Sequence, residues 1–231
     1  MRSLVVAIAT FLALSVLSCQ DTRVEDQKHE TDVAVYRNFG HQIPYETGVQ
    51  WMEYYQQQQG GVQGRKNLLG LGLFSYTISA PQMEAMTASV SDLVGVAFHW
   101  AIDDDGDTHI IAIPVDPTLR LWTSIPGRIY IDSNTGNAIS QTVAQAWAQN
   151  YKDEHPTGIW FHFFGETVIN QVLAVPYFNS VDIEPAINIL NLLPQMLLIV
   201  WNEDLLPFGR SEAERATVFD ASNPCPPCAC E

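Results

Sequence analysis

The sequence predicts an α+β fold built from two tandem α-β-α-β-β modules, with helices packed on mainly antiparallel sheet. The first observation behind this prediction is an internal repeat. The segment "IPYETGVQWMEYYQ" at 43–56 matches "ISQTVAQAWAQNYK" at 139–152, and "GLFSYTIS" from Gly72 matches "GIWFHFFG" from Gly158. The second observation is that both copies continue with apolar runs of strand-forming residues, which indicate paired strands.

Each copy opens with an amphipathic helix, expected at 44–58 in the first copy and at 140–154 in the second. Each helix carries a tryptophan and a tyrosine four residues apart, and this spacing puts the two rings on one face. The two pairs are Trp51 with Tyr55, and Trp147 with Tyr151. Pro44 fits the first turn of the first helix, Ser140 fits the N-cap of the second, and Pro156 stops it.

The remaining elements follow in the same order in both copies. They are a strand, a short helix and two further apolar strands, expected at 72–78, 80–90, 93–102 and 109–115, then at 158–164, 166–175, 182–190 and 195–201. The tails also match, as "IYIDSN" and "VFDASN". A copy of about 90 residues buries only a modest core, so we expect the two copies to pack together.

The organisation along the chain has five parts. Residues 20–35 hold almost no large apolar side chains and cannot bury enough surface to offset the entropy of ordering. The expected parts are a signal peptide at 1–18, a disordered tether at 19–38, the two repeat modules at 39–135 and 136–223, and a Cys/Pro tail at 224–231.

The start of the chain, "MRSLVVAIATFLALSVLSCQ", reads as a secretory signal, because a charge at Arg2 precedes an apolar run that ends in small residues. A membrane-spanning anchor is the alternative, but such a helix needs about 20 apolar residues and this run is shorter. The stretch "VLSC" resembles the lipobox of bacterial lipoproteins, which implies lipidation of Cys19. Gln20 after the cysteine points to the outer membrane by the rule for that class. An ordinary secreted protein is the other interpretation.

Composition argues against a nucleic-acid partner. The whole chain has 11 Lys and Arg against 26 Asp and Glu, and loss of the signal peptide, which carries only Arg2, leaves a net charge of −16. Phosphate contacts need clustered cations, and here they are scattered. The acidity equally opposes an electrostatic hold on anionic lipid, so membrane attachment would depend on the N-terminal lipid.

The stretch "IDDDGDTH" is the most site-like part of the folded region. An EF-hand loop needs carboxylates at its first and twelfth positions, but counting from Gly106 puts Ala101 and Ala112 there. Asp105-Gly106 between two apolar strands is instead a hairpin signal. We therefore predict a solvated turn, with weak or accidental cation binding as the alternative.

No motif ties the histidines to a metal or to catalysis, and the sequence predicts no catalytic, metal or cofactor site. A two-residue turn at Asp105-Gly106 would put His99 and His109 on opposite faces of the hairpin, and a longer one that pairs Ala101 with His109 would put them on the same face. Two ligands are in either case too few for zinc. His162 has five apolar neighbours and is expected to occupy an aromatic packing position.

The tail "CPPCAC" contains Cys225, Cys228 and Cys230. Redox C-x-x-C motifs depend on a helix N-terminus to lower the thiol pKa, and too few residues follow here to form one. A disulfide that leaves one cysteine free and a thiol cluster for a soft metal both remain open.

The second copy, with "AQAWAQNYKDEHPTGIWFHFFGETVINQVL", a hairpin and the terminal "CPPC", resembles a group of uncharacterised proteins from the Bacteroidota. In that group a similar helix, an aromatic "hFFG" strand and a C-terminal C-P-P-x-C recur. The first copy resembles the pattern only loosely, because it lacks "FFG". The resemblance implies a source phylum and a cell-envelope setting, but no activity and no binding residues.

Taken together, these patterns favour an outer-membrane lipoprotein, facing the periplasm or the cell surface, whose body is a non-enzymatic binding module for an envelope protein or another envelope component. One alternative is a hydrolase with a site between the two repeats, where pockets tend to form. The other alternative is a metal or redox handle at the C-terminal cysteines. An exposed apolar patch on the helices would favour the binding module, and a pocket that gathers His99, His109 and an aspartate from another strand would favour the enzyme.

Overall fold

The computed structural model describes residues 33–58, 76–202, 216–220 and 224–225. The chain divides into two units, Met1–Val35 and Tyr36–Glu231. In the first unit only residues 33–35 are described, and they are helical. All elements below belong to the second unit. No helix within the described ranges combines the length and the apolarity that crossing a membrane requires.

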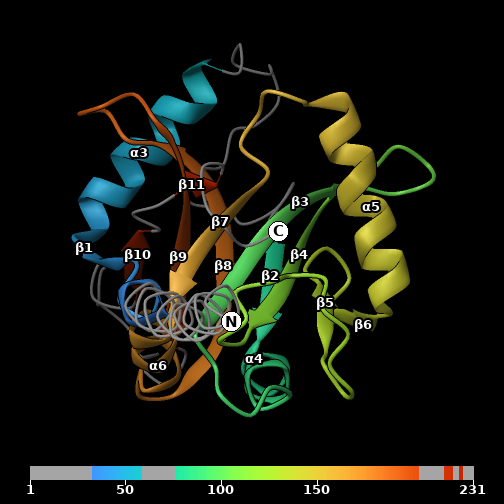
Figure 1. Cartoon of the computed structure of the whole chain (residues 1–231). Coiled ribbons are helices and arrows are strands. Elements are labelled where there is room, and N and C mark those ends of the chain that lie inside the picture. The colour runs from blue at the N-terminus through green and yellow to red at the C-terminus, as the bar shows by residue number, and fades with distance from the viewer. Residues whose placement is uncertain (1–32, 59–75, 203–215, 221–223, 226–231) are drawn as a thin grey trace, which may run out of the picture. The chain divides into compact units, whose positions relative to one another are not determined.

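The second unit consists of two antiparallel sheets and four helices among its described residues (Figure 1). The five-stranded sheet has the order β1-β10-β9-β8-β2 and the six-stranded sheet the order β11-β7-β3-β4-β5-β6. The elements in chain order are β1 (His41–Ile43), α3 (Tyr45–Gln58), β2 (Tyr76–Ser79), α4 (Ala80–Thr87), β3 (Gly95–Ile102), β4 (Thr108–Val115), β5 (Tyr130–Asp132), β6 (Asn137–Ile139), α5 (Gln141–Glu154), β7 (Phe161–Gly165), α6 (Glu166–Leu173), β8 (Phe178–Ile187), β9 (Pro194–Asn202), β10 (Ala216–Asp220) and β11 (Pro224–Cys225). The predicted α+β class of helices on mainly antiparallel sheet is confirmed.

The two sheets share one apolar core. Val96 and Phe98 of β3 pack in the same cluster as Leu198 of β9, and Tyr76 of β2 makes an edge-to-face contact with Trp100 of β3 at 5.9 Å between ring centroids. Helices α4 and α6 contact each other and strands of both sheets, at the lower end of the view in Figure 1. Because both copies supply this core, neither buries its apolar strands alone.

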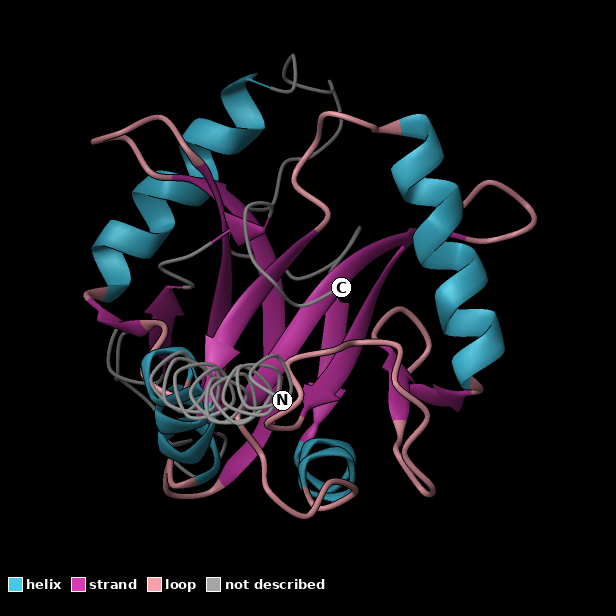
Figure 2. Cartoon of the chain, in the orientation of Figure 1, coloured by secondary structure: helices cyan, strands magenta, loops and turns pink. Residues whose placement is uncertain are grey.

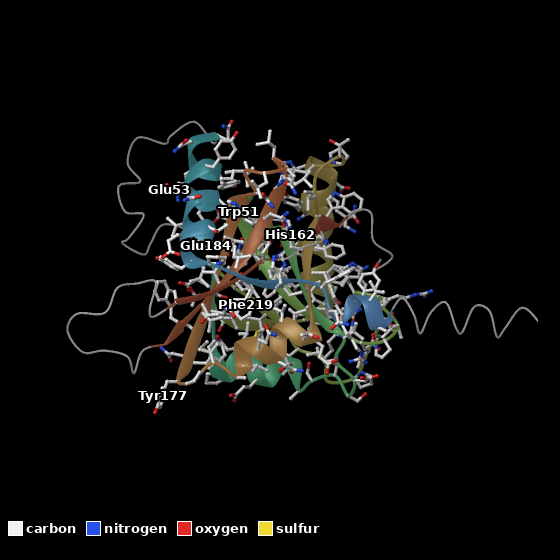
Figure 3. The ribbon with its side chains drawn as sticks, turned by 90° about the vertical axis from the view of Figure 1, so that its left-hand side faces the viewer. Trp51, Glu53, His162, Tyr177, Glu184 and Phe219 are labelled. Atoms are coloured by element: carbon white, nitrogen blue, oxygen red, sulfur yellow. The ribbon has the colours of Figure 1, made fainter. Side chains whose placement is uncertain are left out.

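The two long helices cover the other faces of the sheets. Leu198 points into the shared core, so its neighbours Leu197 and Ile199 point the opposite way, and both pack in a second cluster with Trp51 of α3. Figure 3 shows Trp51 directed from α3 towards the sheet and Glu53 on the other side of the helix. Helix α5 packs correspondingly against β3 of the six-stranded sheet.

The first two strands of each copy lie in the sheet of the other copy. The five-stranded sheet contains β8, β9 and β10 of the second copy, flanked by β1 and β2 of the first. The six-stranded sheet contains β3, β4 and β5 of the first copy, with β6 and β7 of the second on either side. Sequence patterns are local, and they gave no indication of this exchange.

The repeat has the register that the sequence indicates. Helices α3 and α5 both have 14 residues, and Trp51 and Trp147 are each the seventh. Helices α4 and α6 both have eight residues and follow Ser79 and Gly165 directly. The Ser140 hydroxyl accepts a hydrogen bond from the backbone N–H of Val143, so the predicted N-cap is confirmed.

Some boundaries differ from the sequence prediction. Strand β8 begins at Phe178, four residues before the predicted 182, and ends at Ile187. Residues 72–75 of one predicted strand lie outside the described residues. The equivalent strands β5 and β10 end at Asp132 and Asp220, so the tails align one residue away from the "IYIDSN" and "VFDASN" match. Short edge strands such as β1 and β6 hold too few residues to show an alternating pattern.

Gly165, the glycine of "FFG", lets residues 36–39 pass close to the backbone of β7. A Cβ atom on Gly165 would lie 2.4 Å from the carbonyl oxygens of Tyr36 and Arg37, and the Gly165 N–H donates to the carbonyl of Phe39 at 2.8 Å. Gly95, its partner on β3, would meet the backbone of Phe164 in the same way. Any side chain at Gly165 would push residues 36–39 off the sheet.

Candidate functional site

The predicted lipidation site and most of the thiol cluster lie outside the described residues. This applies to Cys19, Cys228 and Cys230. The backbone of Cys225 is described, and it pairs with Phe161 as part of β11.

His99 and His109 lie on the same face of the β3–β4 hairpin. Ala101 pairs with His109 and Ile102 with Thr108, which is the longer-turn register of the two that the sequence left open. The histidines nevertheless have separate surroundings. His99 stacks on Phe161 at 5.6 Å between ring centroids, whereas His109 contacts Trp147 of α5 at 4.8 Å.

His109 lies between two carboxylates. Its Nδ1 is 2.9 Å from Oδ1 of Asp132 on β5, and its Nε2 is 3.2 Å from Oδ2 of Asp103 in the turn. Asp132 also accepts from the Thr135 hydroxyl at 2.7 Å and from the backbone N–H of Asn134. We call His109, Asp132, Asp103 and Trp147 the His109 cluster. Because both ring nitrogens are engaged and His109 is 7% exposed, neither nitrogen is presented to a substrate.

The aspartates of "IDDDGDTH" form a structured turn. Oδ1 of Asp103 accepts from the backbone N–H groups of Asp105 at 3.0 Å and Asp107 at 2.8 Å, and Gly106 has a φ of 88°. The predicted turn is thus confirmed. Burial alone would raise the pKa of Asp103, but the hydrogen bonds from Asp107, His109 and Asp105 together lower it below its ordinary value. Asp103 therefore holds the turn together and also contacts His109.

His99 and His162 are fully buried among aromatic and apolar side chains. Nδ1 of His99 donates to the carbonyl of Trp100 at 2.6 Å, but its Nε2 has no hydrogen-bond partner among the described residues, and neither has Nδ1 of His162. Burial lowers the pKa of each ring to about 3. Both rings are therefore neutral at physiological pH, as expected for core histidines and not for general bases tuned near neutrality.

The second copy changes the residues of the His109 cluster but keeps one acid. Strand pairing puts Gln195 where the first copy has His109, and Asp220 where it has Asp132. Asp220 is 3% exposed, and burial raises its pKa to about 6, although nearby His41 opposes this. The sequence could have revealed this shared acid if the two tail segments had been aligned at Asp132 and Asp220.

The β8–β9 hairpin ends in an exposed apolar tip that sequence reasoning missed. Four aliphatic side chains are strongly exposed there: Ile189 (41%), Leu190 (86%), Leu192 (61%) and Leu193 (47%). We call these four residues the apolar tip. The equivalent hairpin of the first copy carries Asp103–Asp107, and Figure 2 shows the two loops projecting at opposite margins of the unit. The sequence signal was available, because no charged residue lies between Glu184 and Glu203.

Comparison with known proteins gives no further guidance: no family model, no curated protein and no solved structure matches the chain. Within the described residues, no group of three or more His, Cys, Asp or Glu side chains is arranged to hold a metal ion.

Proposed function

We propose that the protein is an outer-membrane lipoprotein, anchored through Cys19, whose duplicated body is a non-enzymatic binding module of the cell envelope. The signal pattern that ends at "VLSC" supports the anchor. The body would face the periplasm or the cell surface. The net charge of −16 after signal removal argues against nucleic acid as a partner.

The exposure of the apolar tip is the main evidence for the binding role. Large aliphatic side chains on a projecting loop cost free energy in water unless another surface covers them. Leu190, at 86% exposure, gains nothing from the protein's own core. The first copy forms the same hairpin with aspartates, so the β-hairpin itself does not require apolar residues at its end.

The surroundings of His99 and His109 give little support to the hydrolase alternative. Where the two copies meet, the described residues form an apolar core that includes Phe98, Phe164 and Phe219. His99 and His109 do not come together with an aspartate in one pocket, since only His109 contacts carboxylates. A hydrolase remains an alternative that no specific contact favours, and Cys228 and Cys230 of the cysteine handle lie outside the described residues.

Two measurements test the proposal. Metabolic labelling with a palmitate analogue should mark the wild-type chain and leave Cys19→Ala unlabelled. Crosslinking and affinity capture of the lipidated protein from its native envelope should recover an envelope component that is lost in a Leu190→Asp, Leu192→Asp variant. Equal labelling of wild type and Cys19→Ala would refute the anchor. Turnover in an activity screen together with no captured component would favour the enzyme.

A further inference from the structure

The two equivalent hairpins of the repeat have opposite chemistry at their ends. The β3–β4 turn presents exposed Asp104, Asp105 and Asp107. The β8–β9 turn presents the apolar tip, and Leu190 is its most exposed side chain. Because both turns end an equivalent pair of strands, the difference in chemistry is confined to the turns.

Part of the backbone at the apolar tip is already hydrogen-bonded within the loop. The N–H of Asn188 donates to the carbonyl of Leu193 at 3.0 Å, and the N–H of Leu192 donates to the carbonyl of Asn188 at 2.7 Å. The side-chain oxygens of Asn188 and Asn191 accept from the N–H groups of Leu190 and Leu193 at 2.9 and 3.0 Å. This partial pairing lowers the cost of burying the side chains at the boundary between headgroups and acyl chains, where the other backbone groups still reach water.

The composition of the tip fits lipid better than a protein partner. Protein-binding hot spots are enriched in Trp, Tyr and Arg, and leucine is under-represented in them. The apolar tip is entirely aliphatic, and the residue between its members and the residue just before it are asparagines. No charged residue lies between Glu184 and Glu203. A strongly acidic protein has no electrostatic hold on anionic lipid, so apolar insertion is the mode of contact open to it.

We infer that the apolar tip inserts its side chains at the boundary between headgroups and acyl chains of the membrane to which the N-terminal lipid holds the chain. The inference rests on the proposed lipoprotein function, because the anchor supplies the high local concentration that lets a small apolar contact form. The tip then fixes the orientation of the body on the bilayer. The acidic turn of the first copy stays in water.

Photocrosslinking tests this directly. The lipidated full-length chain is reconstituted in vesicles of phosphatidylethanolamine and phosphatidylglycerol that contain a phospholipid with a diazirine on its acyl chain. After irradiation, mass spectrometry should find lipid adducts on the peptide with residues 188–193 and none on the peptide with residues 103–107. Leu190→Asp with Leu192→Asp should lower the adducts at least about ten-fold, because each substitution replaces an inserted aliphatic side chain with a charged one.

The control variant is Asp104→Asn with Asp105→Asn, which changes the equivalent turn and should leave the adducts unchanged. Circular dichroism establishes that both variants fold. Adducts spread evenly over the surface, or absent from the peptide with residues 188–193, would overturn the inference. A palmitate-labelled protein with no adducts on the tip refutes insertion and leaves the lipoprotein proposal standing, whereas adducts on an unlabelled protein refute the anchor alone.

Discussion

Nδ1 of His109 lies 2.9 Å from Oδ1 of Asp132, and this pair ties β4 to β5 where the second copy has Gln195 and Asp220. His109→Ala would leave the buried Asp132 carboxylate with fewer donors. Leaving a buried carboxylate short of a hydrogen-bond donor costs more than the roughly 1–3 kcal/mol of a neutral group, and we expect a loss of about 2–4 kcal/mol in the free energy of unfolding. Urea unfolding measures it as a lower midpoint with an unchanged slope.

The second copy supplies the matched control for this pair. His109→Gln introduces the residue that the equivalent position already holds, and its amide can still donate to Asp132. We expect it to lose less than half as much free energy of unfolding as His109→Ala. If both variants unfold at the wild-type urea concentration, the His109 cluster does not stabilise the fold.

Asp220 should make the protein less stable as the pH rises. Burial raises its pKa to about 6 from an ordinary value of 3.8, so the folded chain holds this proton more tightly than the unfolded chain does. The stabilisation is complete below about pH 4 and is lost as the pH rises through about 6. Asp220→Asn should remove this dependence, so that relative to wild type it gains on the order of 3 kcal/mol between about pH 4 and pH 8. Urea unfolding across this range checks it, and a constant difference between the two proteins would contradict it.

His99 and His162 should change the stability in the opposite direction. Burial lowers both pKa values to about 3 from 6.5, so the unfolded chain binds more protons and acid destabilises the fold between these values. In nuclear magnetic resonance spectra, both ring signals should stay fixed from about pH 8 to pH 5. His162→Tyr, the residue at the equivalent Tyr76, should reduce the acid sensitivity. Titration of either ring near neutral pH would show that it is not buried as the structure has it.

Most elements of the fold could be predicted from sequence because their signals are local. The Trp51 and Trp147 helices have an i, i+4 aromatic face, and Ser140 marks a helix start. The exchange of β1, β2, β6 and β7 between the sheets could not be predicted, because pairing of residues far apart in the chain leaves no local pattern.

The sites were harder to predict for the same reason. Asp132 and His109 are 23 residues apart and meet only through the pairing of β4 with β5. Leu190 falls within the strand predicted at 182–190 and Leu192 in the gap before the strand predicted at 195–201, and nothing in this apolar run shows that both lie exposed at the end of a hairpin. Strand β8 ends at Ile187, and this boundary is what exposes them.

The four aspartates of the β3–β4 turn should give the protein little affinity for calcium. Asp103 is already committed, because its oxygens accept from Asp105, Asp107 and His109. An ion would be left with the exposed Asp104, Asp105 and Asp107, without the fixed ligands at first and twelfth positions that give a loop its affinity. Binding to the folded state adds about 0.4 kcal/mol when the ligand concentration equals Kd.

That amount corresponds to a rise in Tm of about one degree for a unit of this size. We therefore expect 1 mM calcium, roughly the affinity range of extracellular calcium modules, to raise the Tm by no more than about one degree relative to a chelator-treated sample. Asp104→Asn with Asp107→Asn should leave that response unchanged, whereas Asp103→Asn should lower the Tm with or without calcium, because it weakens the turn and the contact with His109. A calcium-dependent rise of many degrees that the first variant abolishes would mean that the carboxylates rearrange around the ion and that the turn is a binding site after all.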